Sequence, residues 1–152
     1  MFNFELAISV FESAKIDYLI NVPATSMNPI YNYYESKTRC IYASREEEGL
    51  AIASGIAVAG YLPLLMIQQS GVGNMLNCLF GLAECYEIYF PILVLDRGIS
   101  DENPVQAYSS LQTNKIIRAL EEPVVLDFSD LMAESIFRSG IECKRRWYIT
   151  NY

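Results

Sequence analysis

Histidine is absent from this sequence of 152 residues. The chain therefore lacks the side chain that most often serves as a general base near neutral pH and as a transition-metal ligand. Basic residues are scarce as well, since 11 lysines and arginines stand against 18 acidic residues and give a formal net charge of −7. Lys144-Arg145-Arg146 is the longest basic run. A nucleic-acid partner is not expected, because binding to phosphates depends on clustered positive charge.

Long apolar runs are missing too. The longest, around Leu62 to Ile67, is far shorter than the roughly 20 residues that cross a bilayer. The first residues, Met1 to Glu5, lack the basic segment of an export signal. The sequence has four cysteines, Cys40, Cys78, Cys85 and Cys143. Their spacing is not that of a disulfide framework or zinc site, so we expect reduced, buried thiols, no metal, no membrane contact and a cytoplasmic location.

Hydrophobic residues make up 52% of the chain, and its length suits a single domain over residues 1–152. Apolar periodicity predicts segments that alternate between helix and strand. The predicted helices are 2–14, 27–34, 44–60, 74–86, 111–120 and 131–138. The predicted strands are 17–22, 39–43, 62–67, 91–96, 123–126 and 146–150. This alternation indicates an α/β fold, a three-layer, doubly wound and mostly parallel sheet.

An acidic helix start follows the second predicted strand. Ser44 and Glu47 have the spacing of a capping box, in which Glu47 returns to the Ser44 N–H and leaves Glu46 free for chemistry. The alternative is that the three glutamates only begin a helix, where negative charge is favourable. The helix that follows is rich in small residues from Gly49 to Gly60, which favours close approach of a partner helix.

A glycine-containing turn follows the third predicted strand. Gly71 and Gly73 fit the start of a dinucleotide-binding GxGxxG motif, but the third position is Leu76, and the chain has no GK[ST] of a P-loop. We expect a tight turn that exposes Gln69, Ser70 and Asn74 to a polar or anionic group beside a helix N-terminus. The alternative is a plain turn capped by Asn74. The polar segment 97–109 is long for a connection and is expected to be functional.

Two motifs together resemble a known family. Arg45-Glu46-Glu47-Glu48-Gly49, followed by Gly55 and Gly60, and the segment Gln68 to Asn74, reading QQSGVGN, are similar to the pyrimidine-binding domain of thiamine-diphosphate enzymes. Within that superfamily the chain most resembles sulfopyruvate decarboxylase α subunits and phosphonopyruvate decarboxylases. The similarity extends over roughly residues 3–126.

The resemblance implies roles for particular residues. The family glutamate that binds N1′ of the aminopyrimidine precedes a helix glycine by nine positions, which gives Glu46 when counted from Gly55, while a register anchored on Gly49 gives Glu47. The residues expected to contact the cofactor are Glu46, Pro23, Ala24, Gln69, Gly71 and Asn74. The residues expected to contact the substrate are Thr25, Gln69, Ser70, Arg97 and Gln106.

The resemblance also implies a cofactor and a partner. The family uses thiamine diphosphate and Mg²⁺, but this chain lacks the GDG motif and downstream asparagine that bind the diphosphate and the metal. A diphosphate-binding β subunit and a hetero-oligomer are therefore expected. The implied reaction is decarboxylation of a small anionic 2-oxoacid, sulfopyruvate first, to sulfoacetaldehyde and CO2. The catalytic histidines of some relatives are missing here, so another group must donate the proton, and Gln69 or a group of the partner is a candidate.

Three alternatives remain open at this stage. The substrate is phosphonopyruvate or another 2-oxoacid; the domain is catalytically silent and only binds a partner; or the chain is a generic α/β binder of a nucleotide or flavin.

Overall fold

The computed structural model of the chain describes residues 3–24 and 27–151 and contains a six-stranded sheet. The strands are β1 (Tyr18–Asn21), β2 (Cys40–Tyr42), β3 (Pro63–Gln68), β4 (Ile92–Asp96), β5 (Val124–Val125) and β6 (Trp147–Asn151). Their order is β2-β1-β3-β4-β6-β5, and every neighbouring pair is parallel. The predicted α/β, doubly wound fold is confirmed.

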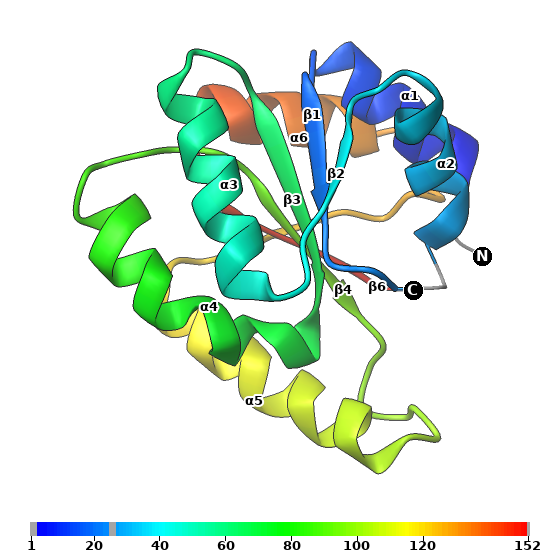
Figure 1. Cartoon of the computed structure of the whole chain (residues 1–152). Coiled ribbons are helices and arrows are strands. Elements are labelled where there is room, and N and C mark those ends of the chain that lie inside the picture. The colour runs from blue at the N-terminus through cyan, green and yellow to red at the C-terminus, as the bar shows by residue number, and fades with distance from the viewer. Residues whose placement is uncertain (1–2, 25–26, 152) are drawn as a thin grey trace.

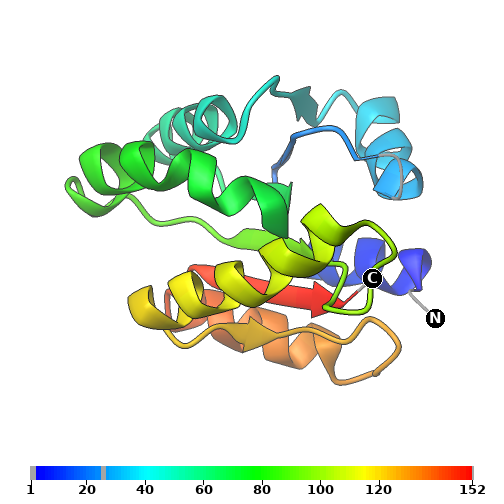
Figure 2. The same cartoon turned by 90° about the horizontal axis from the view of Figure 1, so that it is seen from below.

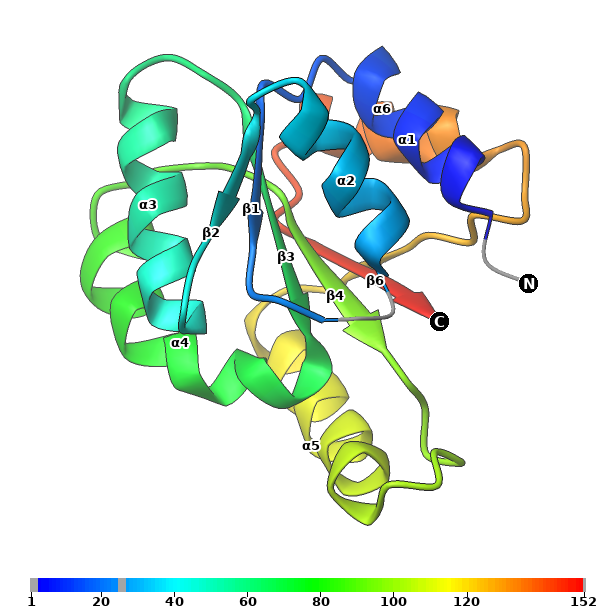
Figure 3. The same cartoon turned by 45° about the vertical axis from the view of Figure 1, so that its right-hand side comes forward.

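Helices cover both faces of this sheet (Figure 3). One face carries α1 (Phe4–Ser13), α2 (Asn28–Ser36) and α6 (Ala133–Glu142), and the other carries α3 (Glu46–Val58), α4 (Val72–Cys78) and α5 (Pro104–Leu120). The single-turn 3-10 helix η2 (Gln69–Gly71) leads into α4, which continues as the π-helical segment η3 (Leu79–Glu84). Viewed from below, α3 and α4 lie side by side (Figure 2).

The strands separate two hydrophobic cores. In β1 and β3, Leu19 and Met66 pack towards α1 and α2, whereas Ile20 and Leu65 pack towards α3 and α4. All four side chains are fully buried. Continuous apolar strands are what a parallel sheet covered on both faces requires, because both sides of each strand are removed from water.

The order of the strands creates a topological switch between β1 and β3. The chain leaves β1 through α2 on one face to reach β2, and leaves β3 through α4 on the opposite face to reach β4. In Figure 1 the strands point downwards, and the N-terminal ends of α3 and α5 lie at the lower end of the sheet. Ligands of open α/β sheets bind outside the carboxyl ends of the strands at such a point.

Two of the element boundaries that differ from the sequence prediction lie near the switch point. Helix α5 begins at Pro104, seven residues before the predicted start at Leu111. The reason is local, because Asn103 accepts a hydrogen bond from the Val105 N–H and Pro104 stands where a helix needs no N–H donor. After β3 the chain turns through the single-turn helix η2, and α4 begins at Val72, two residues before its predicted start at Asn74.

The four cysteines are free thiols. Cys40 and Cys78 are half-buried, but Cys85 and Cys143 are exposed, so the prediction that all four are buried is wrong. Over residues 3–24 and 27–151, none of the helices combines the length and the apolar character needed to cross a bilayer.

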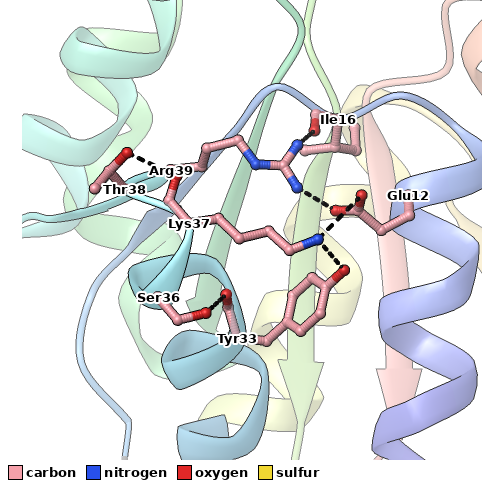
Figure 4. Close-up of polar contacts among 7 residues, drawn as sticks. All are labelled: Glu12, Ile16, Tyr33, Ser36, Lys37, Thr38 and Arg39. Carbon is pink, nitrogen blue, oxygen red and sulfur yellow. Dashed lines mark hydrogen bonds and ion pairs between the residues drawn. The ribbon is translucent and has the colours of Figure 1, made fainter.

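A polar network ties α1, α2 and β2 together at the amino ends of the strands (Figure 4). The Glu12 carboxylate lies 2.5 Å from Arg39 Nη2 and 4.0 Å from Lys37 Nζ. Arg39 also donates to the Ile16 carbonyl at 3.1 Å and covers the ring of Tyr34 at 5.0 Å. This network lies at the end of the sheet opposite the switch point, so we assign it to stability.

Candidate active site

The Glu46 carboxyl group is packed against the backbone of Gly71. Glu46 begins α3 and is half-buried, and its Oε2 accepts a hydrogen bond from Asn74 Nδ2 at 3.0 Å. A Cβ built on Gly71 would lie 2.5 Å from Glu46 Cγ, and nearer still to the carboxylate. The backbone of Gly71 is right-handed helical, with φ −86°. Glycine is therefore needed here for the close approach of Glu46 and not for an unusual backbone angle.

Glu47 and Glu48 have other partners. The chain stays extended through Arg45, which is the N-cap of α3, and the Ser44 N–H donates to Glu48 Oε2 at 2.7 Å. Glu47 lies 3.3 Å from Arg45 Nε, with 42% of its side chain exposed. The predicted capping box is thus wrong by one position, because the helix begins one residue later and moves the returning carboxylate from Glu47 to Glu48.

Gln69 is held from α5 rather than exposed. It is only 1% exposed, and its Nε2 donates to Gln106 Oε1 at 3.0 Å and to the Gln106 carbonyl at 3.3 Å. Thr113 Oγ1 donates to the Gln69 carbonyl at 2.7 Å. The expected exposure is therefore wrong for Gln69 and correct for Ser70 and Asn74. Gln106, expected on a loop, lies in the first turns of α5 because the helix starts early.

Arg97 follows β4, and one nitrogen of its guanidinium group forms an ion pair. Its Nε lies 2.7 Å from Asp101 Oδ2, and 40% of its side chain is exposed. The nearby Asp96 carboxylate accepts hydrogen bonds from the Gly98 N–H and Asn114 Nδ2, both at 2.9 Å. Gly98 has a positive φ of 79°, which glycine adopts without strain. Figures 1 and 3 show this connection and the start of α5 projecting past the sheet.

The structure thus brings some of the predicted residues together and leaves others apart. Glu46 contacts both Gly71 and Asn74, and Gln69 is hydrogen-bonded to Gln106. In the turn after β1, Ala24 is buried and Pro23 is exposed, while Thr25 lies outside the described residues.

Sequence reasoning missed several polar residues at this end of the sheet. Asn21, the last residue of β1, is fully buried, and both side-chain amide atoms lack a hydrogen-bond partner in the part of the chain that is described. Asn21 is the one side-chain amide in the otherwise mostly apolar segment Asp17 to Val22, and this could have marked it as a candidate site residue. Asp96, Asn114 and Thr113 gave no signal, because their roles depend on α5 crossing the ends of the strands.

Tyr31 of α2 lies near the turn after β1. Burial raises the pKa of its phenol, an effect that the Ala24 backbone N–H partly opposes. Its ring meets that of Tyr42 edge-on at 6.4 Å. Around the switch point the described residues contain no group of three acidic, cysteine or histidine side chains able to hold a metal ion.

Comparison with known proteins finds a family model, curated relatives and a solved structure that resemble this chain. Residues 4–116 match the family model described as thiamine pyrophosphate enzyme, N-terminal TPP binding domain. Sulfopyruvate decarboxylase subunit alpha of Methanothermobacter thermautotrophicus is 30% identical over 122 residues, which cover 78% of this chain and 74% of the relative. The subunit of the same name from Methanococcus maripaludis is 28% identical over 111 residues, or 71% and 66% of the two chains.

A solved structure described as split gene transketolase, inactive beta4 tetramer, is similar as well. It superposes with a TM-score of 0.64 and 11% identity over 97% of this chain and 48% of its own. At that identity the likeness concerns the fold alone.

Proposed function

The chain belongs to the family of N-terminal TPP-binding domains of thiamine pyrophosphate enzymes, and from this membership we propose that it is the α subunit of a two-chain 2-oxoacid decarboxylase. The proposed substrate is sulfopyruvate, which yields sulfoacetaldehyde and CO2. The names of the two relatives support this choice. Phosphonopyruvate or another small anionic 2-oxoacid is the alternative substrate.

One observation carries the proposal, namely the Glu46 carboxyl group held against the bare Cα of Gly71 at the carboxyl edge of the sheet. A carboxylate in a fixed position can hold and return a proton at its Oε atoms. Asn74 fixes the orientation of Glu46 by donating to Oε2. When bound, thiamine diphosphate supplies the electron sink that loss of CO2 requires, and the protein supplies orientation and proton handling.

The donor set at this edge fits the aminopyrimidine half of that cofactor. Glu46 is half-buried, so its carboxylate is accessible to a heterocycle as well as held by Asn74. A Cβ on Gly73 would meet no atom of the described residues within 4 Å, which leaves the backbone there open to close approach. We assign Glu46, Gly71, Asn74 and Gln69 to the pyrimidine side, with Pro23 and Ala24 in the adjoining turn.

Glu46 is favoured over Glu47 as the proton-handling residue. Glu47 is engaged with Arg45, whereas the atoms nearest to a Cβ built on Gly71 all belong to Glu46. The register counted from Gly55 agrees with this choice.

Arg97 is the proposed contact for the anionic tail of the substrate. Asp101 occupies Nε, so the remaining Nη donors of the fork can meet a sulfonate, phosphonate or carboxylate. Ser70 and Thr25 are the other proposed substrate contacts, with Gln106 acting through Gln69.

A diphosphate-binding β subunit with Mg²⁺ is the proposed partner, because this chain lacks the GDG motif. The outer face of α3 and η3 supports such a contact, since Val58 is 71% exposed and Phe80 is 50% exposed. Gly55 lies on the same exposed face of α3, and a Cβ there would meet no atom within 4 Å among the described residues. Small residues on a helix allow another helix to come close.

The test is Glu46→Gln in the complex reconstituted with a candidate β chain. Turnover should fall by about 10²–10⁴-fold, the usual contribution of a general acid–base group. Glu47→Gln, the same change one residue away, should leave turnover near the wild-type value. A catalytically silent domain would lose nothing in either variant. Titration with thiamine diphosphate and Mg²⁺, with and without the β chain, separates the proposal from a generic nucleotide or flavin binder.

A further inference from the structure

The side chain of Gln69 is clamped by α5. Nε2 lies 3.0 Å from Gln106 Oε1 and 3.3 Å from the Gln106 carbonyl oxygen, while the Gln69 carbonyl accepts from Thr113 at 2.7 Å. Gln69 directly follows β3 at the switch point and is 1% exposed. Both the main chain and the amide of this residue are therefore fixed by one helix.

The contacts with Gln106 determine which atom of the Gln69 amide faces which neighbour. A main-chain carbonyl only accepts hydrogen bonds, so the Gln69 atom beside the Gln106 carbonyl must be the nitrogen. A flipped amide would set oxygen against oxygen. The nitrogen has two hydrogens and two acceptors near it, so its capacity to donate is used by Gln106.

The remaining polar atom of the side chain, Oε1, is buried and lacks a hydrogen-bond partner among residues 3–24 and 27–151. A buried acceptor without a partner is costly, and such atoms in a folded protein require an explanation. Oε1 belongs to the residue that follows β3, the strand that borders the ligand-binding crevice expected at a switch point.

We propose that Gln69 Oε1 accepts a hydrogen bond from an N–H or O–H group of the bound ligand, and that Gln106 is the positioning residue that sets this polarity. The inference rests on the proposed function, because it takes the cofactor and substrate from there. It requires the side chains over Oε1 to move aside when the ligand binds. It also removes Gln69 as a proton donor, since neither amide hydrogen is available.

Because Gln69 offers only an acceptor, Oε1, to the ligand, it can contact only a part of the ligand that carries a hydrogen-bond donor. Sulfonates and carboxylates carry no hydrogen at neutral pH and cannot satisfy an acceptor, so the anionic tail belongs elsewhere, on the side of Arg97. The 4′-amino group of thiamine diphosphate has N–H donors, and a 2-hydroxy acid that resembles the substrate has an O–H donor. These two sources share one chemistry and are separated by experiment.

The experiment compares wild type and Gln69→Met in the two-chain complex. Binding of thiamine diphosphate with Mg²⁺, and of an analogue with an oxo group in place of the 4′-amino group, is measured by calorimetry. If the amine is the donor, the variant should bind thiamine diphosphate about tenfold more weakly, the size of one hydrogen bond, and bind the oxo analogue unchanged. If the substrate side is the donor, a 2-hydroxy acid inhibitor should weaken about tenfold while its deoxy analogue does not.

Two further variants complete the test. Gln106→Met frees the Gln69 amide to turn, and it should reduce the difference in affinity between the two ligands of the affected pair. If Gln106 had only a structural role, its replacement would weaken the binding of both ligands of a pair equally. Gln112→Met, the same chemical change on α5, is the control and should bind every ligand as the wild type does. No change in Gln69→Met, or equal weakening of paired ligands, overturns the inference. Failure of the wild-type complex to bind thiamine diphosphate would instead overturn the proposed function.

Discussion

Replacing Gly71 with alanine tests whether the position of Glu46 depends on the bare Cα beside it. The backbone at Gly71, with φ −86° and ψ −13°, is allowed for alanine, so the change introduces no backbone strain. The new methyl carbon would lie 2.5 Å from Glu46 Cγ, far inside the contact distance of about 3.5–4.0 Å. Glu46 must therefore leave its place and give up the hydrogen bond from Asn74.

The expected changes in stability and in activity differ greatly in size. Loss of the bond between Glu46 and Asn74 costs about 0.5–1.5 kcal/mol, and the better helix propensity of alanine returns up to about 1 kcal/mol. The free energy of unfolding should thus change by no more than about 1 kcal/mol. Turnover of the complex should fall about 10²-fold, because a displacement of roughly 1 Å at a reacting group has that effect.

The assay combines urea unfolding of the variants with turnover of the reconstituted complex. Gly73→Ala is the matched control, since a Cβ there contacts no atom of the described residues within 4 Å and should leave stability equal or slightly higher. Asn74→Ala should lower stability in the wild type but not in Gly71→Ala, because the bond is already broken there. Wild-type turnover by Gly71→Ala, or an additive effect of the second substitution, would refute the reasoning.

Two other outcomes are expected. Arg39→Met should lower the free energy of unfolding by about 1–2 kcal/mol, because it removes the partly buried contact with Glu12 and leaves the Ile16 carbonyl unpaired. Lys37→Met should lower it by at most about 0.5 kcal/mol, because Lys37 lies 4.0 Å from Glu12 and is more exposed. Equal effects of the two substitutions in urea unfolding would contradict this. Burial raises the pKa of Tyr89 to about 12, so the folded chain keeps a phenolic proton that the unfolded chain releases above about pH 10. The contribution of Tyr89 to stability should be constant below about pH 10 and should fall by up to about 1.4 kcal/mol per pH unit as the pH rises to about 12. An unchanged urea midpoint between these two pH values would argue against it.

Much of the fold was readable from the sequence because its signals are local. The apolar run Leu62 to Ile67 and the run Pro91 to Asp96 mark strands buried on both faces, and β3 and β4 lie there. The start of α5 was missed although Asn103-Pro104 is a helix-start signal, because the polar composition of the segment favoured a loop.

The candidate site was only partly readable. Glu46 and Gly71 are 25 positions apart, and nothing in their spacing shows that one packs on the other. The capping-box rule placed the returning carboxylate on Glu47, because it could not foresee an extended Arg45. Gln69 was read as exposed because its burial depends on α5, an element that arrives later in the chain.

Both edge strands of the sheet are short. The edge strand β5 has two residues, and the opposite edge strand, β2, has three. Pro123, which lacks an N–H, precedes β5, and Asp127 follows soon after it. Neither edge strand has a row of free main-chain groups long enough to pair with a further strand, and this protects the chain from edge-to-edge aggregation. A continuous sheet running through two polypeptides is thus disfavoured, and assembly is expected to join helix to helix.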